Sequence, residues 1–208
     1  GAIARTTITT GYLAGHAEAA RFPLSPHSSL YPTEMASTLA SPDLAAALES
    51  AGVTESRPRT VTILVSESDS FKVSIAGYLS RTLSTDVLTV SVRSLPWSDY
   101  LTALQNGNFD LYLGEVRLTA NWDISSLART GGALNYGGAA SDEMTAALTR
   151  WLTCTQDEQT EAMDSLCQVF REQSPILPVC FKRTSVLMTQ GAVETITPTA
   201  ANPFYGLK

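Results

Sequence analysis

The chain has 208 residues, of which 44% are hydrophobic and 16% are charged, a composition typical of a folded globular protein with one sizeable core. Its formal net charge is −6 and its 14 basic residues are scattered, which argues against binding to a nucleic-acid backbone. No apolar run is long enough to span a bilayer, and no signal-peptide pattern is found in the first residues.

The first part of the sequence predicts two helices separated by an irregular segment. Residues 2–14 have helical spacing but no N-cap in front of them. Residues 22–32 contain so much proline and serine that we expect an extended surface segment. Residues 41–43 combine an N-cap serine, a first-turn proline and a first-turn acid, so a helix is expected to begin there and to end at Gly52.

The middle of the sequence alternates strand and helix patterns. The β-branched run 60–65 predicts a strand, and the apolar spacing over 75–83 predicts a helix. Alternation over 88–92 predicts a second strand, Pro96 opens another helix, and residues 109–114 predict a third strand. The apolar stripe of the helix after Pro96 is expected to consist of Trp97, Tyr100, Leu101 and Leu104. Such alternation indicates an α/β fold in which helices cover a sheet.

The last part of the sequence predicts two further helices and a final strand. Apolar stripes over 144–152 and 162–170 mark the helices. Thr155 and Glu158 have the spacing of a capping box in front of the second helix. Residues 176–183 predict a strand, and the proline within it favours a sheet edge or a bulge.

Signatures of catalysis are scarce. The sequence has no GxSxG, HExxH, Walker or GxGxxG motif. His16 and His27 lie in or beside the least regular part of the chain, where a solvated or capping role is typical. Cys154, Cys167 and Cys180 belong to no CxxC or Cys/His cluster, so we expect free, buried thiols and no metal site. We therefore expect a protein that is not an enzyme and uses no cofactor.

The richest group of polar and aromatic residues lies in a long loop, residues 115–141, after the third predicted strand. Ligand crevices in open α/β sheets form beyond the strand ends, and such a group could hold a zwitterion by its ammonium and carboxylate groups. The candidate substrate-binding residues are Glu115, Arg117, Asn121, Trp122, Asp123, Asn135 and Tyr136. The alternative is that Glu115 and Arg117 form a surface ion pair and that Trp122 belongs to the core.

Several segments together resemble the family 5 extracellular solute-binding proteins, the dipeptide- and oligopeptide-binding components of ABC transporters. The chain opens with AIARTTITTGYLAGHA, which resembles the family's "A-I-D-R…G-x-A" helix, and FPLSPHSSLYP is similar to the proline-rich stretch after it. The segment SPDLAAALESAG resembles the family's "A-xx-L-L-xx-A-G" helix, and TVTILVSES resembles the strand behind that helix. The segment LPWSDYLTALQNGNFDLYLGEV is similar to the family's "W-xx-Y…G-x-F-D" segment. The remaining matches are NYGGAASDEMTAALTRWL and SPILPVCFKRTSVL. In this order the matches cover nearly the whole chain.

The resemblance implies a periplasmic-binding-protein-like type II lobe with a mixed sheet covered by helices. Residues 1–208 would form a single lobe, the C-terminal ligand-binding lobe of a two-lobe receptor whose first lobe is absent from this sequence. The implied function is solute binding for an ABC importer of peptides or related small solutes. The implied partners are a small peptide or other small solute and the permease subunits. The implied location is extracellular, anchored at the cell surface or periplasmic, and any membrane attachment would be a lipoprotein anchor outside this chain.

Two positions depart from the family's pattern. Ala4 stands where the family has the Asp that precedes Arg5. Peptide-binding members present an Asp to the ligand's ammonium group in the loop after the "F-D" strand, and gapless counting puts Thr119 there. Glu115 and Asp123 are the nearby acids that could take over this role.

Two other functions stay open at the level of sequence. The first is the ligand-sensing domain of a transcriptional regulator, because such lobes are reused there and free cysteines suit a reducing cytoplasm. The second is a hydrolase that uses His16 or His27. Residues upstream of this sequence would separate transporter from regulator, through a signal sequence with a lipid-attachment Cys or a helix-turn-helix.

Overall fold

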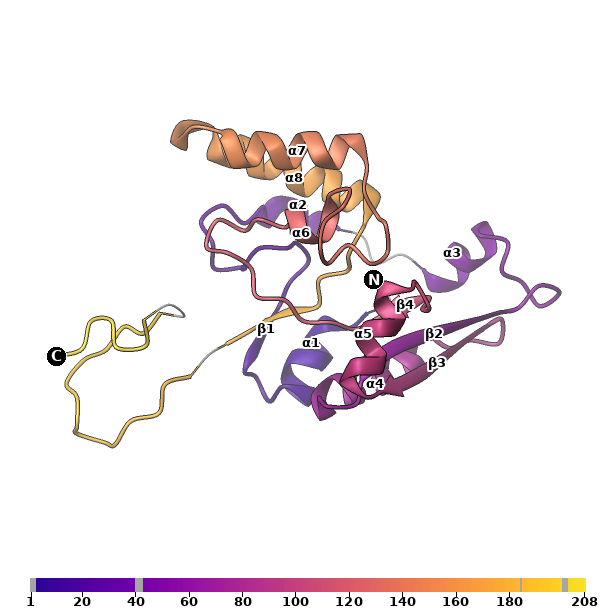
Figure 1. Cartoon of the computed structure of the whole chain (residues 1–208), viewed down its shortest axis with the longest axis horizontal. Helices are drawn as coiled ribbons and strands as arrows, with labels where there is room; N and C mark the ends of the chain where they lie inside the picture. Colours follow the sequence, from indigo (N-terminus) through magenta and orange to yellow (C-terminus); the bar gives the residue numbers. More distant parts are fainter. Residues whose placement is uncertain (1–2, 40–42, 184, 200–201) are drawn as a thin grey trace.

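The computed structural model describes residues 3–39, 43–183, 185–199 and 202–208 (Figure 1). In chain order, its first elements are α1 (Arg5–Thr7), the π-helical turn η1 (Ile8–Tyr12), β1 (Ala17–Ala19), α2 (Thr33–Thr38), α3 (Leu44–Ser50), β2 (Arg59–Ser66), α4 (Ser70–Leu83) and β3 (Leu88–Leu95). They are followed by α5 (Trp97–Gln105), β4 (Leu111–Tyr112), α6 (Ser125–Ala128), α7 (Asp142–Thr153), the short 3-10 helix η2 (Gln156–Glu158), α8 (Gln159–Gln173) and β5 (Cys180–Lys182). Within the described ranges, no helix has the length and apolar character needed to cross a membrane.

The larger sheet is parallel and has the strand order β3-β2-β4. Its central strand, β2, pairs over its whole length with β3, so that Val61 lies opposite Val90. On its other side Ile63 lies opposite Leu111 of β4. Because the three strands run in the same direction, their carboxyl ends lie at one edge of the sheet, which we call the carboxyl edge.

Helices cover both faces of the parallel sheet. Ile63 and Val65 point to the face where Ile75 and Leu79 of α4 are buried. Leu64 points to the opposite face, against Tyr100, Ala103 and Leu104 of α5. This alternation follows from the two-residue period of a strand, and burial on both faces explains why the consecutive residues Ile63, Leu64 and Val65 of β2 are all apolar.

A second, smaller sheet pairs two segments that are far apart in the sequence. Strand β1 runs antiparallel to β5, with Ala17 opposite Lys182 and Ala19 opposite Cys180. The sequence did not predict β1, and the strand predicted over 176–183 contains only three residues with strand pairing. The α/β fold class is confirmed, but the parallel and antiparallel strands lie in two sheets rather than in one mixed sheet.

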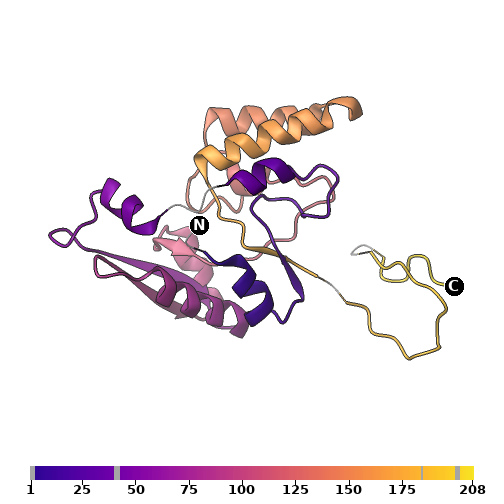
Figure 2. The same ribbon diagram turned by 180° about the vertical axis from the view of Figure 1, so that it is seen from behind.

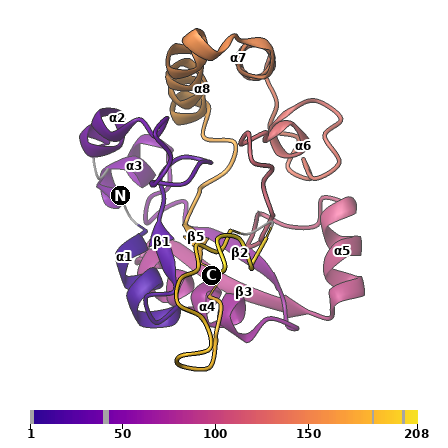
Figure 3. The same ribbon diagram turned by 90° about the vertical axis from the view of Figure 1, so that its left-hand side faces the viewer.

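A helical layer lies apart from the parallel sheet and consists of α2, α6, α7 and α8 (Figures 1 and 3). Its core buries Met144 and Trp151 of α7 against Met163, Leu166 and Phe170 of α8. The predicted stripe of α8 and the predicted capping box of Thr155 and Glu158 are confirmed. The stripe of α7 is confirmed from Met144 to Trp151, but Leu152, which was predicted to belong to it, is exposed. The N-cap of helix α7 is Ser141, whose hydroxyl accepts a hydrogen bond from the Met144 N–H.

Several predicted boundaries are wrong. The opening helix contains only Arg5–Thr7 in α-helical geometry, continued by one π-helical turn to Tyr12, and Ala2 lies outside the described residues. The predicted cap at Ser41 and Pro42 also lies outside them, and Asp43 caps α3 by accepting a hydrogen bond from Ala45. The third strand is limited to Leu111–Tyr112. The long loop contains a short helix, α6, which breaks it into two parts.

The three cysteines are free, as predicted. Only Cys167 is fully buried, in the helical layer, and this burial raises the pKa of its thiol to about 12. Cys154 and Cys180 are half-buried, so the expectation of three buried thiols holds for one of them.

The segment after β5 extends away from the rest of the molecule (Figures 1 and 2). Its only regular feature within the described residues is a set of backbone hydrogen bonds, including those from Thr197 to Tyr205 and from Glu194 to Lys208. Leu187 and Phe204 in this segment are largely exposed.

Candidate functional site

The carboxyl edge of the parallel sheet carries four charged side chains in contact. The Lys72 Nζ lies 2.6 Å from the Asp69 carboxylate and 3.0 Å from the Glu115 carboxylate. The Lys182 Nζ lies 2.8 Å from the same Glu115 oxygen. We call these residues the lysine–carboxylate cluster, and its formal charges cancel because it contains two lysines and two carboxylates.

Three different parts of the fold bring this cluster together. Asp69 lies between β2 and α4 and is the N-cap of α4, because its carboxylate accepts a hydrogen bond of 3.0 Å from the Lys72 backbone N–H. Glu115 follows the neighbouring strand β4, and Lys182 ends β5 in the smaller sheet. The parallel pairing of β2 with β4 explains why the first two segments meet, since both leave the sheet at the same edge.

Hydrogen bonding in the cluster shifts the pKa of Glu115 and that of Lys72 toward their ionised forms. Hydrogen bonds from Lys182 and Lys72 hold the pKa of Glu115 below its usual range, against a smaller opposing effect of burial. Burial by itself would lower the pKa of Lys72, but its hydrogen bonds to Asp69 and Glu115 together outweigh burial and raise that pKa. The site therefore presents ammonium and carboxylate groups in one small area.

Large apolar side chains are exposed after each strand of the parallel sheet. Phe71 follows β2 and is 57% exposed, Trp97 follows β3 and is 56% exposed, and Val116 follows β4 and is 40% exposed. Trp97 stacks on Tyr100 with ring centroids 5.6 Å apart. Single exposed apolar residues are common, but three that all follow strand ends at one edge give this edge the mixture of aromatic, apolar and charged groups found in ligand sites.

The candidate residues of the long loop fall into different environments. Glu115 belongs to the lysine–carboxylate cluster, and Arg117 is exposed two positions further on. Glu115 does form ion pairs, as the alternative interpretation expected. Two of the cations that it contacts are Lys72 and Lys182, which that interpretation did not name. Of the predicted set, Glu115 and Arg117 are thus the residues that directly follow the carboxyl edge.

The middle of the loop is held against the helical layer. Trp122 is half-buried there, and its ring meets Phe181 of β5 edge-on with centroids 5.7 Å apart. Its backbone φ of 57° lies in the left-handed region, a strained conformation that persists only where the surroundings impose it. Trp151 of α7 donates a 2.8 Å hydrogen bond to the backbone carbonyl of Asn121. The interpretation of Trp122 as part of the core is therefore supported in part.

The remaining predicted residues make hydrogen bonds or ring contacts with nearby parts of the chain. The Asp123 carboxylate accepts a 2.8 Å hydrogen bond from the Ser125 N–H at the start of α6. The Asn135 amide donates to the Arg129 carbonyl at 3.0 Å. Tyr136 packs edge-on against Tyr112. Their role in ligand binding stays a prediction.

Thr119, at the position where the resembled family has an acid, is part of the turn that leads to α6. Its hydroxyl accepts a 3.2 Å hydrogen bond from the Asp123 N–H, and its carbonyl accepts one of 3.0 Å from the Trp122 N–H. The acid that lies at the carboxyl edge is Glu115, so of the two acids considered as substitutes it is the better placed.

Sequence reasoning missed Asp69, Lys72 and Lys182. A signal for Asp69 existed, because an acid directly between a predicted strand and a predicted helix is typical of an N-cap at a strand end. No local signal marks Lys182, since its place depends on the pairing of β5 with β1. In the described part of the chain, no group of three or more His, Cys, Asp or Glu side chains could hold a metal ion.

No protein-family model and no curated protein matches the chain. Solved structures do. The periplasmic oligopeptide-binding protein of a Thermotoga maritima oligopeptide ABC transporter, bound to mannohexaose, is 21% identical with a TM-score of 0.73, over 97% of this chain and 43% of that chain. The Bacillus subtilis oligopeptide-binding protein AppA, in complex with a nonapeptide, is 18% identical with a TM-score of 0.71, over 87% of this chain and 40% of that one.

A third similar structure is that of NikA from Staphylococcus aureus in complex with Ni(L-His)2, which is 15% identical with a TM-score of 0.69. It is matched over 87% of this chain and 40% of that chain. The chain has a periplasmic-binding-protein-like fold. At these identities the likeness establishes the fold, and the chain spans less than half the length of each of these three proteins.

Proposed function

We propose that this chain is the solute-binding lobe of a receptor that serves an ABC importer, with peptides or related small solutes as ligands. The observation that carries the proposal is the carboxyl edge, where both the lysine–carboxylate cluster and the exposed side chains of Phe71, Trp97 and Val116 follow strand ends. The fold supports it, because the three similar structures are of binding proteins that hold mannohexaose, a nonapeptide or Ni(L-His)2. The proposed role is binding, without catalysis.

The chemistry of the edge suits a zwitterionic solute. The side chains of Glu115 and Lys182 are 47% and 45% exposed, whereas those of Asp69 and Lys72 are 25% and 21% exposed. The outer pair can therefore exchange its intramolecular partner for a ligand ammonium or carboxylate group, because exposed ion pairs are nearly neutral in free energy. The inner pair keeps Glu115 in position, and the exposed rings offer surface to apolar parts of the solute.

The proposal includes the organisation of the complete receptor. Residues 1–208 act as a single lobe, and a lobe outside this sequence closes over the carboxyl edge and completes the site. The permease subunits, a lipid anchor outside this chain and a location at the cell surface or in the periplasm belong to the same proposal. The solute stays unspecified within small peptides and similar molecules, since the similar structures hold ligands of three different chemistries.

No observation favours the two alternative functions. The three similar structures are of binding proteins, and none is a transcriptional regulator. His27 is largely exposed and contacts the Glu18 carboxylate at 2.6 Å, which is the geometry of a surface ion pair. His16 is exposed as well.

Native mass spectrometry tests the proposal on the complete protein, purified from its own cells without denaturation. We expect one retained solute per protein molecule. In the complete protein, Glu115→Gln should weaken binding of that solute by roughly 1–3 kcal/mol, the range for a charged hydrogen bond. Glu161→Gln is the matched control, because it removes an ion pair of 2.8 Å on the helical layer.

Two results would contradict the proposal. One is a protein that retains no solute and binds neither Ala-Ala nor Ala-Ala-Ala in calorimetric titrations. The other is a retained solute whose affinity falls equally in Glu115→Gln and Glu161→Gln, because this would show that binding does not depend specifically on the carboxyl edge.

A further inference from the structure

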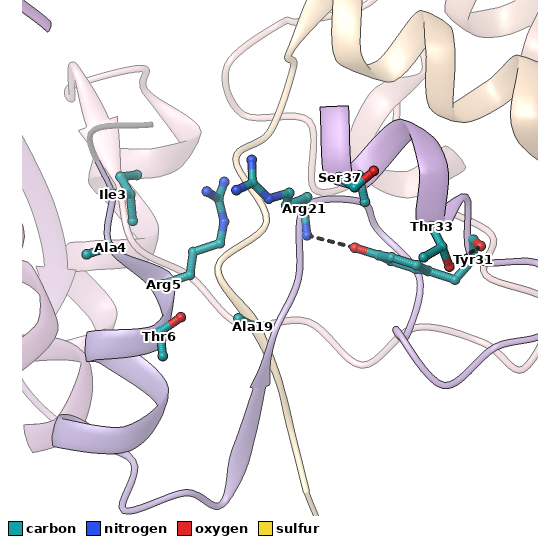
Figure 4. Close-up of a pocket in the computed structure, with 10 residues that line it drawn as sticks. Ile3, Ala4, Arg5, Thr6, Ala19, Arg21, Tyr31, Thr33 and Ser37 are labelled. Atoms are coloured by element: carbon teal, nitrogen blue, oxygen red, sulfur yellow. Dashed lines mark hydrogen bonds between the residues drawn. The ribbon is translucent and has the colours of Figure 1, made fainter. Parts of the chain in front are cut away.

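A hollow of about 550 Å³ lies between α1 and α2 (Figure 4), and none of the four residues of the lysine–carboxylate cluster lines it. Its volume falls within the roughly 300–1,000 Å³ of small-molecule sites. Alanine side chains leave the space open, and arginine, tyrosine, threonine and serine side chains supply the polar groups. The residues that line it include Ala4, Arg5, Ala19, Arg21, Tyr31 and Ser37.

Two guanidinium groups point toward one another across this hollow (Figure 4). The Arg5 Nε donates a 2.8 Å hydrogen bond to the Pro178 carbonyl, and an Arg21 Nη donates one of 3.4 Å to the Leu39 carbonyl. Each guanidinium has five N–H donors, so these neutral partners leave most donors of both groups available.

Neither arginine has a carboxylate partner. No ion pair among the described residues includes Arg5 or Arg21, and no residue that lines the hollow is acidic. The eight residues outside the description are glycine, alanine, serine, proline and threonine, so they offer no acidic side chain either. Two like charges therefore face each other within this chain without a neutralising side chain.

This arrangement is unfavourable unless an anion joins it. Half-buried charges are normally paired, and burial and, after it, the charge of Arg21 lower the pKa of Arg5. The planar fork of arginine matches a carboxylate or a phosphate in a bidentate way. The Tyr31 hydroxyl accepts a 3.4 Å hydrogen bond from the Arg21 backbone N–H, which places a further polar group at the same wall.

We propose that this hollow is a second binding site, which holds a small organic oxyanion by a carboxylate or phosphate group between Arg5 and Arg21. The available volume admits a molecule larger than the anionic group itself. The site shares no lining residue with the lysine–carboxylate cluster, and it does not depend on the proposed transport function.

Calorimetric titration of the whole 208-residue chain tests the site, with inorganic phosphate and glutarate as probes at constant ionic strength. We expect saturable binding of at least one probe, and Arg21→Gln should weaken it by roughly tenfold or more, as expected for lost charged hydrogen bonds. Arg150→Gln is the control, because it removes an arginine of the helical layer that pairs with Glu161. If only one probe binds, that probe identifies the anionic group of the ligand as a phosphate or a carboxylate. If both bind, the site recognises oxyanions of either kind.

A second variant keeps both arginines and so avoids a loss of folding. Ala4 is the N-cap of α1 and lines the hollow, so Ala4→Asp places a carboxylate beside Arg5 at a position where Asp is favoured. We expect it to raise the melting temperature and to abolish probe binding, because the resident carboxylate occupies the site. Absence of binding by both probes, or binding that survives Arg21→Gln or Ala4→Asp, would overturn the proposal.

Discussion

The helical layer and the carboxyl edge both contain phenylalanine and tryptophan, but the helical layer buries these side chains and the carboxyl edge exposes them. In the helical layer, Phe170 and Trp151 are almost completely buried, at 3% and 6% exposure. At the carboxyl edge, Phe71 and Trp97 are more than half exposed. Burial of an aromatic side chain stabilises a fold, whereas exposure leaves its surface for a partner. The difference indicates that one region holds the chain together and that the other is available for binding.

The charged groups of the two regions differ in the same sense. On the helical layer, Arg150 and Glu161 form a surface ion pair that shares no residue with the other ion pairs among the described residues, and 76% of the Glu161 side chain is exposed. At the carboxyl edge, Glu115 is shared between two lysines that belong to different elements. Matched substitutions in the two regions can therefore separate effects on stability from effects on binding.

The largest expected difference concerns phenylalanine. Phe170→Ala should lower the free energy of unfolding by roughly 3–5 kcal/mol, because it leaves a cavity between α7 and α8. Phe71→Ala removes the same atoms from an exposed position and should change stability by no more than about 0.5 kcal/mol. Urea unfolding followed by circular dichroism measures both values. A large cost for Phe71→Ala would show that the carboxyl edge is already covered within this chain.

The next difference concerns tryptophan. Trp151→Phe removes the 2.8 Å hydrogen bond to the Asn121 carbonyl, which joins the long loop to α7, and should cost roughly 1–3 kcal/mol. Trp97→Phe keeps an aromatic ring on Tyr100 and should stay within about 0.5 kcal/mol of the wild type. The same urea unfolding experiment compares the two. Equal costs would mean that the hydrogen bond does not hold the loop.

A third difference concerns the side-chain N-caps of α4 and α7. Ser141→Ala removes the cap of α7 and Asp69→Ala removes the cap of α4, so each should lower the free energy of unfolding by about 1 kcal/mol. Only Asp69→Ala also frees Lys72 from a partner at 2.6 Å, so only this variant should weaken solute binding by the complete protein. Thermal unfolding and calorimetry measure the two effects. A loss of affinity in Ser141→Ala would contradict the separation.

Local sequence patterns predicted the parts of the fold that depend on local structure. The stripes of α7 and α8, the capping box at Thr155 and the β-branched run of β2 each contain their own signal within a few residues. The stripe of α5 was correct for Tyr100 and Leu104 but wrong for Trp97, which is 56% exposed although its ring stacks on Tyr100.

Features that join distant segments were not predictable from the sequence. Strand β1 has only three residues and exists through pairing with β5, more than 150 positions later in the chain. Lys182 contacts Glu115 because the pairing of β5 with β1 places it there. Sequence patterns therefore predicted that Glu115 follows a strand, but they did not predict its contacts with the two lysines. The long loop was correctly placed after β4, but its contacts with the helical layer depend on Trp151, which pattern analysis assigned only to the helix core.

The smallest expected effect concerns the pH dependence of the lysine–carboxylate cluster. The pKa of Glu115 in the folded chain lies below its ordinary value of 4.5, so its ion pairs stabilise the fold above that pH and cease to do so as the pH falls through the folded pKa. Because the Glu115 side chain is 47% exposed, Glu115→Gln should cost only about 0.2–1 kcal/mol at pH 7. At pH 3 the difference from the wild type should shrink. Urea unfolding of both proteins at the two pH values measures it, with Glu161→Gln as the control for a solvated pair. If the difference in unfolding free energy between the wild type and Glu115→Gln grows on acidification, protonated Glu115 stabilises the fold more than ionised Glu115 does. This result would contradict a stabilising role for the ion pairs of Glu115.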